Sequence, residues 1–212
     1  QPYPRPDPDP MDCYSHGTHV AGSAAGNGVT SAGAAYKGPY SSALNISNMR
    51  IGPGVAPEAE IYALKVFGCF GSSEVVDLAI EWAIDPNGDG NFDDHLDVIN
   101  LSLGSPFGDV NDITTLAVDR AAQIGVLVAA SAGNTGDTWF AVGSPGAATR
   151  AVTVGATQIL ADDTVTEGSW TDLVAAFTTR GPRRSDNFLK PDISAPGSMV
   201  VSVASGTGSP PP

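Results

Sequence analysis

Apolar runs alternate with amphipathic segments over most of the chain. The apolar runs are typical of buried parallel strands, because such strands contact protein on both faces; they cover residues 61–67, 98–103, 125–130 and 151–155. Between them, apolar residues recur at helical spacing behind a residue that can cap a helix; these segments run from Ser72 or Ser73 to about Ile84 and from Asp112 to about Ile124. The alternation predicts an α/β fold with a mostly parallel sheet.

Two segments do not follow this alternation. Residues 1–12 alternate proline with polar residues, so we expect an extended surface arm ahead of a domain that covers residues 13–212. Residues 27–57 are rich in Gly, Ser and Asn and predict a long surface excursion.

Composition narrows the class of protein. The 212 residues suit one domain with one core, and 25 Gly and 17 Pro indicate many loops. The net charge of -13 argues against nucleic acid and an anionic membrane surface as partners. No apolar run reaches the roughly 20 residues of a membrane helix. We expect a soluble, secreted monomer. Because neither a signal peptide nor an initiating methionine opens the chain, we also expect it to be part of something longer.

A histidine opens a stretch of small residues that reads His16-Gly17-Thr18-His19-Val20-Ala21-Gly22. Small residues let a helix over residues 18–26 pack its backbone closely against a neighbour. A histidine at the front of that helix is a candidate proton shuttle, because its pKa lies near neutral pH. The alternative is a metal pair formed by His16 and His19, but no third ligand stands at a fitting distance along the chain.

Two later motifs each follow a predicted strand. Residues 98–104 read Val-Ile-Asn-Leu-Ser-Leu-Gly and, taken alone, suit an ordinary buried strand. Residues 131–136 read Ser-Ala-Gly-Asn-Thr-Gly, in which Asn134 alone suits a turn. Residues 177–182 (Phe-Thr-Thr-Arg-Gly-Pro) and 190–197 (Lys-Pro-Asp-Ile-Ser-Ala-Pro-Gly) complete the series.

In this order, the motifs resemble those of the subtilisin-like serine proteases over nearly the whole chain. The resemblance implies a three-layer α/β/α sandwich and a serine endopeptidase that cleaves proteins through an Asp-His-Ser triad. It assigns His16 the role of general base and Asn134 that of oxyanion donor. It also implies that the backbone of Ser102, Leu103 and Gly104, with Ala132 and Gly133, binds an extended peptide substrate.

The chain departs from the family pattern at both ends. The family's triad aspartate ends an apolar strand well before the histidine, whereas Asp7, Asp9 and Asp12 lie in the proline-rich arm and are expected to be solvated. The nucleophilic serine would fall near position 216, and Ser205-Gly206-Thr207-Gly208 matches only the loop before it. We therefore expect a domain incomplete at both ends and inactive alone.

Two other classes of protein remain open. One is a catalytically dead relative that acts as a peptide-binding module. The other is a nucleotide-binding α/β protein, although no phosphate loop follows a strand.

An acidic loop places oxygen donors at alternate positions, as the first half of an EF-hand does. Position twelve of that pattern is Leu96 rather than glutamate, which argues against a true EF-hand. Some members of the resembling family carry a calcium loop at this place, so we predict a structural Ca²⁺; the alternative is a solvated acidic turn. The candidate ligands are Asp85, Asn87, Asp89, Asn91, Asp93 and Asp94.

The two cysteines, Cys13 and Cys69, can form one bridge or remain two reduced thiols. The resemblance implies the bridge, because the corresponding loops flank the same side of the cleft in the family.

Overall fold

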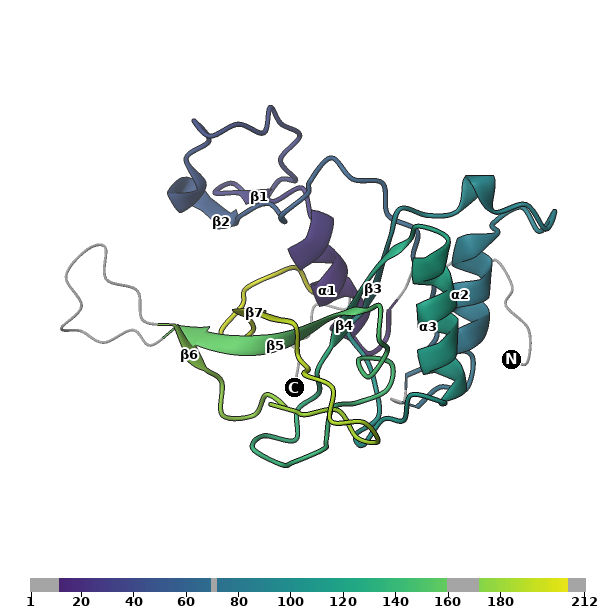
Figure 1. The fold of residues 1–212 in the computed structure, drawn as a ribbon. Helices are drawn as coiled ribbons and strands as arrows, with labels where there is room; N and C mark the ends of the chain where they lie inside the picture. The colour runs from purple at the N-terminus through teal and green to yellow at the C-terminus, as the bar shows by residue number, and fades with distance from the viewer. Residues whose placement is uncertain (1–11, 70–71, 160–171, 206–212) are drawn as a thin grey trace. The chain divides into compact units, whose positions relative to one another are not determined.

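The computed structural model describes residues 12–69, 72–159 and 172–205 (Figure 1). The described residues before Val75 and those from Val201 onward form one compact unit, and Val75–Val200 forms a second. Each unit is described by itself below. Most of the predicted arm, residues 1–11, and the Gly206–Gly208 part of the serine-like motif lie outside the described residues.

Within its described residues, the first unit contains one α-helix, one short 3-10 helix and one small sheet. Helix α1 (His16–Ala25) confirms the predicted helix and begins two residues earlier than expected. The excursion over residues 27–57 carries elements that the sequence pattern did not predict, because they are too short to show a period. They are β1 (Val29–Thr30), η1 (Ile46–Asn48) and β2 (Met49–Ile51), with β1 antiparallel to β2.

The strand predicted over residues 61–67 is wrong in this structure. These residues have no regular secondary structure, and the side chains of Ile61 and Tyr62 are 49% and 51% exposed. An apolar run becomes a strand only when a neighbouring strand supplies hydrogen bonds. Within the described part of the chain, no strand pairs with this run.

The second unit is built on a mixed, mostly parallel sheet (Figure 1). Its strands are β3 (Val98–Leu101), β4 (Leu127–Ser131), β5 (Val152–Ile159), β6 (Asp172–Val174) and β7 (Ile193–Pro196). Parallel pairing joins β3 to β4, β4 to β5 and β5 to β7, and among the described strands of this sheet only β6 runs antiparallel to its neighbour, β5. This confirms the α/β class; β6 and β7 were not among the predicted strands.

Two helices lie side by side in the second unit (Figure 1). Helix α3 (Ile113–Gln123) begins where predicted, because the Asp112 carboxylate accepts hydrogen bonds from the N–H groups of Thr114 and Thr115. Helix α2 (Val76–Ile84) begins after Val75 without a side-chain cap, so the predicted cap at Ser72 or Ser73 is wrong. The short helix η2 (Phe92–Asp94) follows α2.

Alternation along β3 and β4 determines which side chains form the core. Ile99 and Val128 are buried, whereas Val98 and Leu127 are 56% and 53% exposed. On the helices, burial repeats every three to four residues, as expected for one face. The helical residues in the core are Val76, Ile80, Ala83, Thr115, Val118 and Ala121.

Candidate active site

His16 is the first residue of α1, and its side chain is exposed to solvent. The turn before it is held by Asp12, whose carboxylate accepts the N–H groups of Tyr14 (2.9 Å), Ser15 (3.0 Å) and Thr18 (2.8 Å). Asp12 therefore satisfies a first-turn N–H of the helix that carries His16, from three residues before the cap position Ser15, whose own side chain makes no capping hydrogen bond. The expectation that Asp12 is merely solvated is wrong.

The pKa of Asp12 reflects these hydrogen bonds. Partial burial acts to raise the pKa of the carboxyl, but the hydrogen bonds from Thr18, Tyr14 and Ser15 together outweigh it. The pKa consequently lies below its ordinary value, because these donors favour the ionised form.

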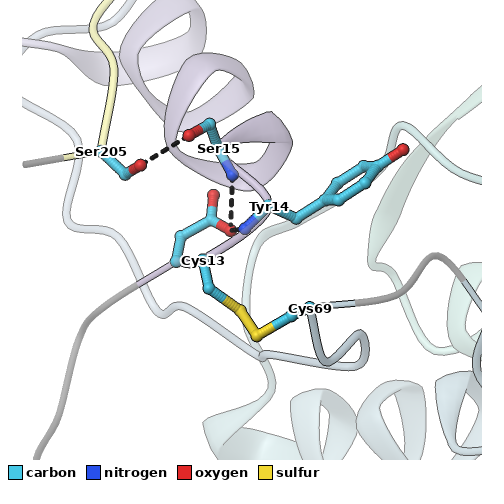
Figure 2. Close-up of a disulfide and its surroundings, with 6 residues drawn as sticks. Cys13, Tyr14, Ser15, Cys69 and Ser205 are labelled. Atoms are coloured by element: carbon cyan, nitrogen blue, oxygen red, sulfur yellow. Dashed lines mark hydrogen bonds between the residues drawn. A yellow bond between two sulfur atoms is a disulfide. The ribbon is translucent and has the colours of Figure 1, made fainter. Parts of the chain in front are cut away.

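A disulfide joins Cys13 to Cys69, as the resemblance implied (Figure 2). It ties the residues just before α1 to the end of the irregular stretch that contains residues 61–67. Both ends of the link belong to the first unit, so the bridge restrains the local chain around His16.

The segment over residues 201–205 packs directly on α1. The Ser202 hydroxyl donates to the carbonyl of His19 (2.9 Å), and the hydroxyls of Ser205 and Ser15 share a hydrogen bond (Figure 2). A Cβ added at Gly22 would lie 2.5 Å from atoms of Ser202 and Val203. This close approach is the reason that the helix needs glycine there, and it confirms the tight packing expected from its small residues.

The predicted peptide-binding residues meet in the second unit, at the carboxyl ends of two adjacent strands. Ser102, Leu103 and Gly104 follow β3, and Ala132, Gly133 and Asn134 follow β4. The Ser131 hydroxyl donates to the Leu103 carbonyl (3.2 Å), which links the two segments directly. In parallel sheets, ligands bind at the carboxyl ends of the strands.

Asn134 lies on an exposed loop with a firmly bonded backbone. The Ala132 N–H donates to the Val154 carbonyl (3.0 Å), and the Ala132 carbonyl accepts from Gly143 (3.1 Å). Gly133 has a φ of 110°, a conformation that favours glycine. The loop therefore presents the asparagine side chain to solvent from an anchored backbone.

The acidic loop after α2 uses its side-chain oxygens internally. Asp85 accepts from the N–H groups of Gly88 (2.9 Å), Asp89 (3.1 Å) and Gly90 (2.9 Å). Asn87 and Asp89 each accept one further backbone N–H of the loop. The oxygen donors suit Ca²⁺ chemically. However, no three His, Cys, Asp or Glu side chains come together as a metal-binding group anywhere in residues 12–69, 72–159 and 172–205.

Two buried cations carry structural interactions that sequence reasoning missed. Lys190 is fully buried, and its Nζ donates to the Ala151 carbonyl (2.8 Å) and to Asp192 (2.7 Å). Burial acts to raise the pKa of Asp192, but the hydrogen bonds from Lys190 and Thr153 lower it below its ordinary value. The lysine of the Lys-Pro-Asp motif thus ties the start of β7 to the start of β5. A lysine beside a proline gives no sign of burial in the sequence.

Arg183 is the second such cation, with 3% of its surface exposed. Its Nη1 donates to the Ala147 carbonyl (2.7 Å) and Thr149 Oγ1 (2.9 Å), while its Nε and Nη2 each donate to one oxygen of the Asp186 carboxylate. The hydrogen bond from Arg183 is the main reason that the pKa of Asp186 falls to about 2. This cluster stabilises the loop that precedes β7.

No helix among the described residues combines the length and apolar character needed to cross a bilayer.

The chain is similar to several serine proteases. It is 36% identical over 206 residues to serine protease AprX of Bacillus subtilis (strain 168), covering 93% of this chain and 41% of the relative. It is 37% identical over 197 residues to subtilisin of Bacillus sp. (strain TA39), covering 90% of this chain and 40% of the relative. Among solved structures, S41 psychrophilic protease matches with a TM-score of 0.65 and 37% identity, over 94% of this chain and 57% of that one.

The class that the fold and the motif order define is therefore that of serine peptidases with an α/β fold. The chain belongs to the subtilase family, because the Peptidase_S8 family model matches residues 1–211. It spans about two fifths of the length of the curated relatives above.

Proposed function

We propose that the protein containing these residues is a subtilisin-like serine endopeptidase. The observation that carries the proposal is the meeting of Ser102–Gly104 with Ala132–Asn134 at the carboxyl ends of β3 and β4. An extended peptide can bind there through backbone hydrogen bonds, which any protein substrate offers. Asn134 would donate its amide to the oxyanion that forms when the carbonyl is attacked.

His16 is proposed as the general base of the same reaction. Its exposed imidazole stands on the first turn of a helix whose start is fixed by Asp12 and by the disulfide. A base must accept a proton from the serine hydroxyl and return it to the leaving amine, which requires a ring open to the cleft.

The triad aspartate and serine match no position within residues 1–212, so these residues alone are proposed not to hydrolyse peptides. A serine-directed phosphonate probe tests this: no labelling is expected of the 212-residue chain, and labelling of the protein expressed with its flanking gene sequence is expected. Labelling of the 212-residue chain would refute the proposal that these residues alone do not hydrolyse peptides. Peptide binding without labelling of the longer protein would instead favour a catalytically dead binding module.

Substitutions in the longer protein test the assigned roles. His16→Ala should abolish peptide hydrolysis, whereas His95→Gln, which alters a histidine outside the motifs, should leave it unchanged. Asn134→Ala should lower kcat by about 100- to 1000-fold, a magnitude that comes from a subtilisin and not from this structure. An active His16→Ala variant would contradict the proposal.

We also propose Ca²⁺ as a structural ligand of the loop over residues 85–94. The support is the alternation of carboxylate and amide oxygens, each with lone pairs left after the internal hydrogen bonds. To bind the ion, the loop would have to rearrange so that these oxygens point toward one place. No step of the proposed peptide hydrolysis depends on the ion. EDTA should lower the melting temperature, and added Ca²⁺ should restore it; an unchanged melting temperature would refute the proposal.

An extracellular location is proposed on the evidence of the disulfide, because such bonds persist in oxidising compartments. Recovery of the protein from the culture medium of its source organism, with the bridge intact, is the expected result. Recovery only from the cell interior with two free thiols would contradict it.

A further inference from the structure

We propose that Thr179 is a positioning residue that holds Asn134 in place for oxyanion binding. The inference rests on the proposed role of Asn134 and adds a residue to which no role has been assigned. Thr179 does not touch the substrate; it acts through the backbone on either side of the asparagine.

Thr179 bonds the loop on both sides of Asn134. Its N–H donates to the carbonyl of Gly133 (3.0 Å), the residue before the asparagine. Its Oγ1 accepts the N–H of Thr135 (3.2 Å), the residue after it, and lies 2.7 Å from the Thr135 hydroxyl. The two peptide units that flank Asn134 are thus tied to a single side chain and its own backbone.

The anchor itself is buried. Thr179 has no exposed surface, whereas Asn134 on the tethered loop is exposed. A Cβ added at Gly133 would lie 3.0 Å from Thr179 Oγ1, so the loop can approach this closely because position 133 is glycine. A second link, from the Gly136 N–H to the Phe177 carbonyl (2.8 Å), runs alongside.

This arrangement meets a requirement of the chemistry. A donor lowers the barrier only if it already points to the place where negative charge develops, because reorientation during the reaction would consume the gain. An asparagine on a free surface loop would sample many orientations. Thr179 is buried, and its hydroxyl and backbone N–H hold one neighbouring peptide each. Together they restrict the backbone from which the Asn134 amide projects.

The test uses the complete protease that contains these residues and compares kcat with KM. Thr179→Val keeps the shape of the side chain but removes the hydroxyl that bonds Thr135. It should lower kcat about 10- to 100-fold, as expected for a displaced catalytic group, and change KM less than about twofold. Thr179→Ser, which keeps the hydroxyl, should restore most of kcat. Thr135→Ala removes part of the same link from the loop side and should lower kcat in the same direction.

The neighbouring Thr178 provides a matched control. It is also buried, but its Oγ1 accepts the N–H of Ala156 on β5 (2.9 Å), and within the described residues its hydrogen bonds go to Ala156 and Ala175 rather than to the asparagine loop. Thr178→Val should lower the melting temperature while leaving kcat within about twofold of the parent protein. If the role of Thr179 is purely structural, Thr179→Val should behave like Thr178→Val: a lower melting temperature with kcat within about twofold of the parent protein.

A double-mutant comparison separates the possible failures. If Thr179 acts through Asn134, Thr179→Val should cost little further kcat in a protein that already carries Asn134→Ala. If Asn134→Ala leaves kcat intact, the proposed oxyanion role fails, and this inference fails with it. If Asn134→Ala lowers kcat but Thr179→Val and Thr135→Ala do not, only the role of Thr179 is refuted. Should Thr179→Val not fold, the Thr135→Ala result decides.

Discussion

The disulfide beside His16 allows a stability prediction with a definite size. Cys13 and Cys69 are 56 positions apart, so the bridge closes a loop of nearly 60 residues. In the chain-entropy description, closing a loop of that length lowers the entropy of the unfolded chain and so raises its free energy by about 4 kcal/mol. Replacing both cysteines by serine should therefore destabilise the chain by about this amount. At about 2–4 °C per kcal/mol for a chain of this size, the melting temperature should fall by about 8–16 °C.

Thermal unfolding of the 212-residue chain, followed by circular dichroism, measures this effect. Reduction of the parent protein with a phosphine should produce the same fall, while the double serine variant should not respond to the reductant. Thiol titration in denaturant should find no free thiol before reduction. Two free thiols before reduction, or a shift below about 2 °C in a chain shown to be bridged, would refute the reasoning.

Other predictions concern packing and charge. Lys190→Met should destabilise the chain by about 2–4 kcal/mol in denaturant unfolding; this is less than for a fully buried pair, because Asp192 is 35% exposed. Lys37→Met, which alters an exposed lysine, should leave the free energy of unfolding almost unchanged. Equal losses of stability in the two variants would contradict the stabilising role of the buried Lys190. The pKa of Asp186 is lowered to about 2, so folding favours its ionised form; its contribution is complete above about pH 4 and disappears as the pH falls through 2. The difference in melting temperature between the parent and Asp186→Asn should therefore shrink from pH 5 to pH 2, and a constant difference would argue against it. Gly22→Ala should cost about 1–3 kcal/mol in the same unfolding assay, because its Cβ would overlap the segment packed on α1; an unchanged midpoint would show that this packing is not tight.

The local elements with strong patterns could be predicted from the sequence. Helix α3 was predictable because Asp112 supplies its own cap and the apolar spacing is clear. Strands β3, β4 and β5 were predictable as apolar runs, although β5 extends to Ile159, four residues beyond the predicted run. The segments after β3 and β4 that we propose to bind a peptide were placed by motif order, and parallel pairing then brings such segments together.

Other features depended on contacts between distant residues. The apolar run over residues 61–67 has the composition of a strand, but strand formation requires a partner, and none pairs with it among the described residues. Asp12 is a local case: it looked like one more polar residue of a proline-rich arm, and its donors lie only two to six residues away. The two donors of Thr18 reach its carboxylate only when α1 forms.

The sequence by itself determined the family, the order of the motifs and the identity of the residues assigned to the chemistry. Only the tertiary structure decided which residues support them. Buried Lys190 bonds Asp192, Gly22 leaves room for Ser202, and Thr179 bonds the residues on both sides of Asn134. The reason is physical. Residue type and local spacing are encoded one position at a time, whereas burial and hydrogen-bond partners arise from chain segments far apart in the sequence.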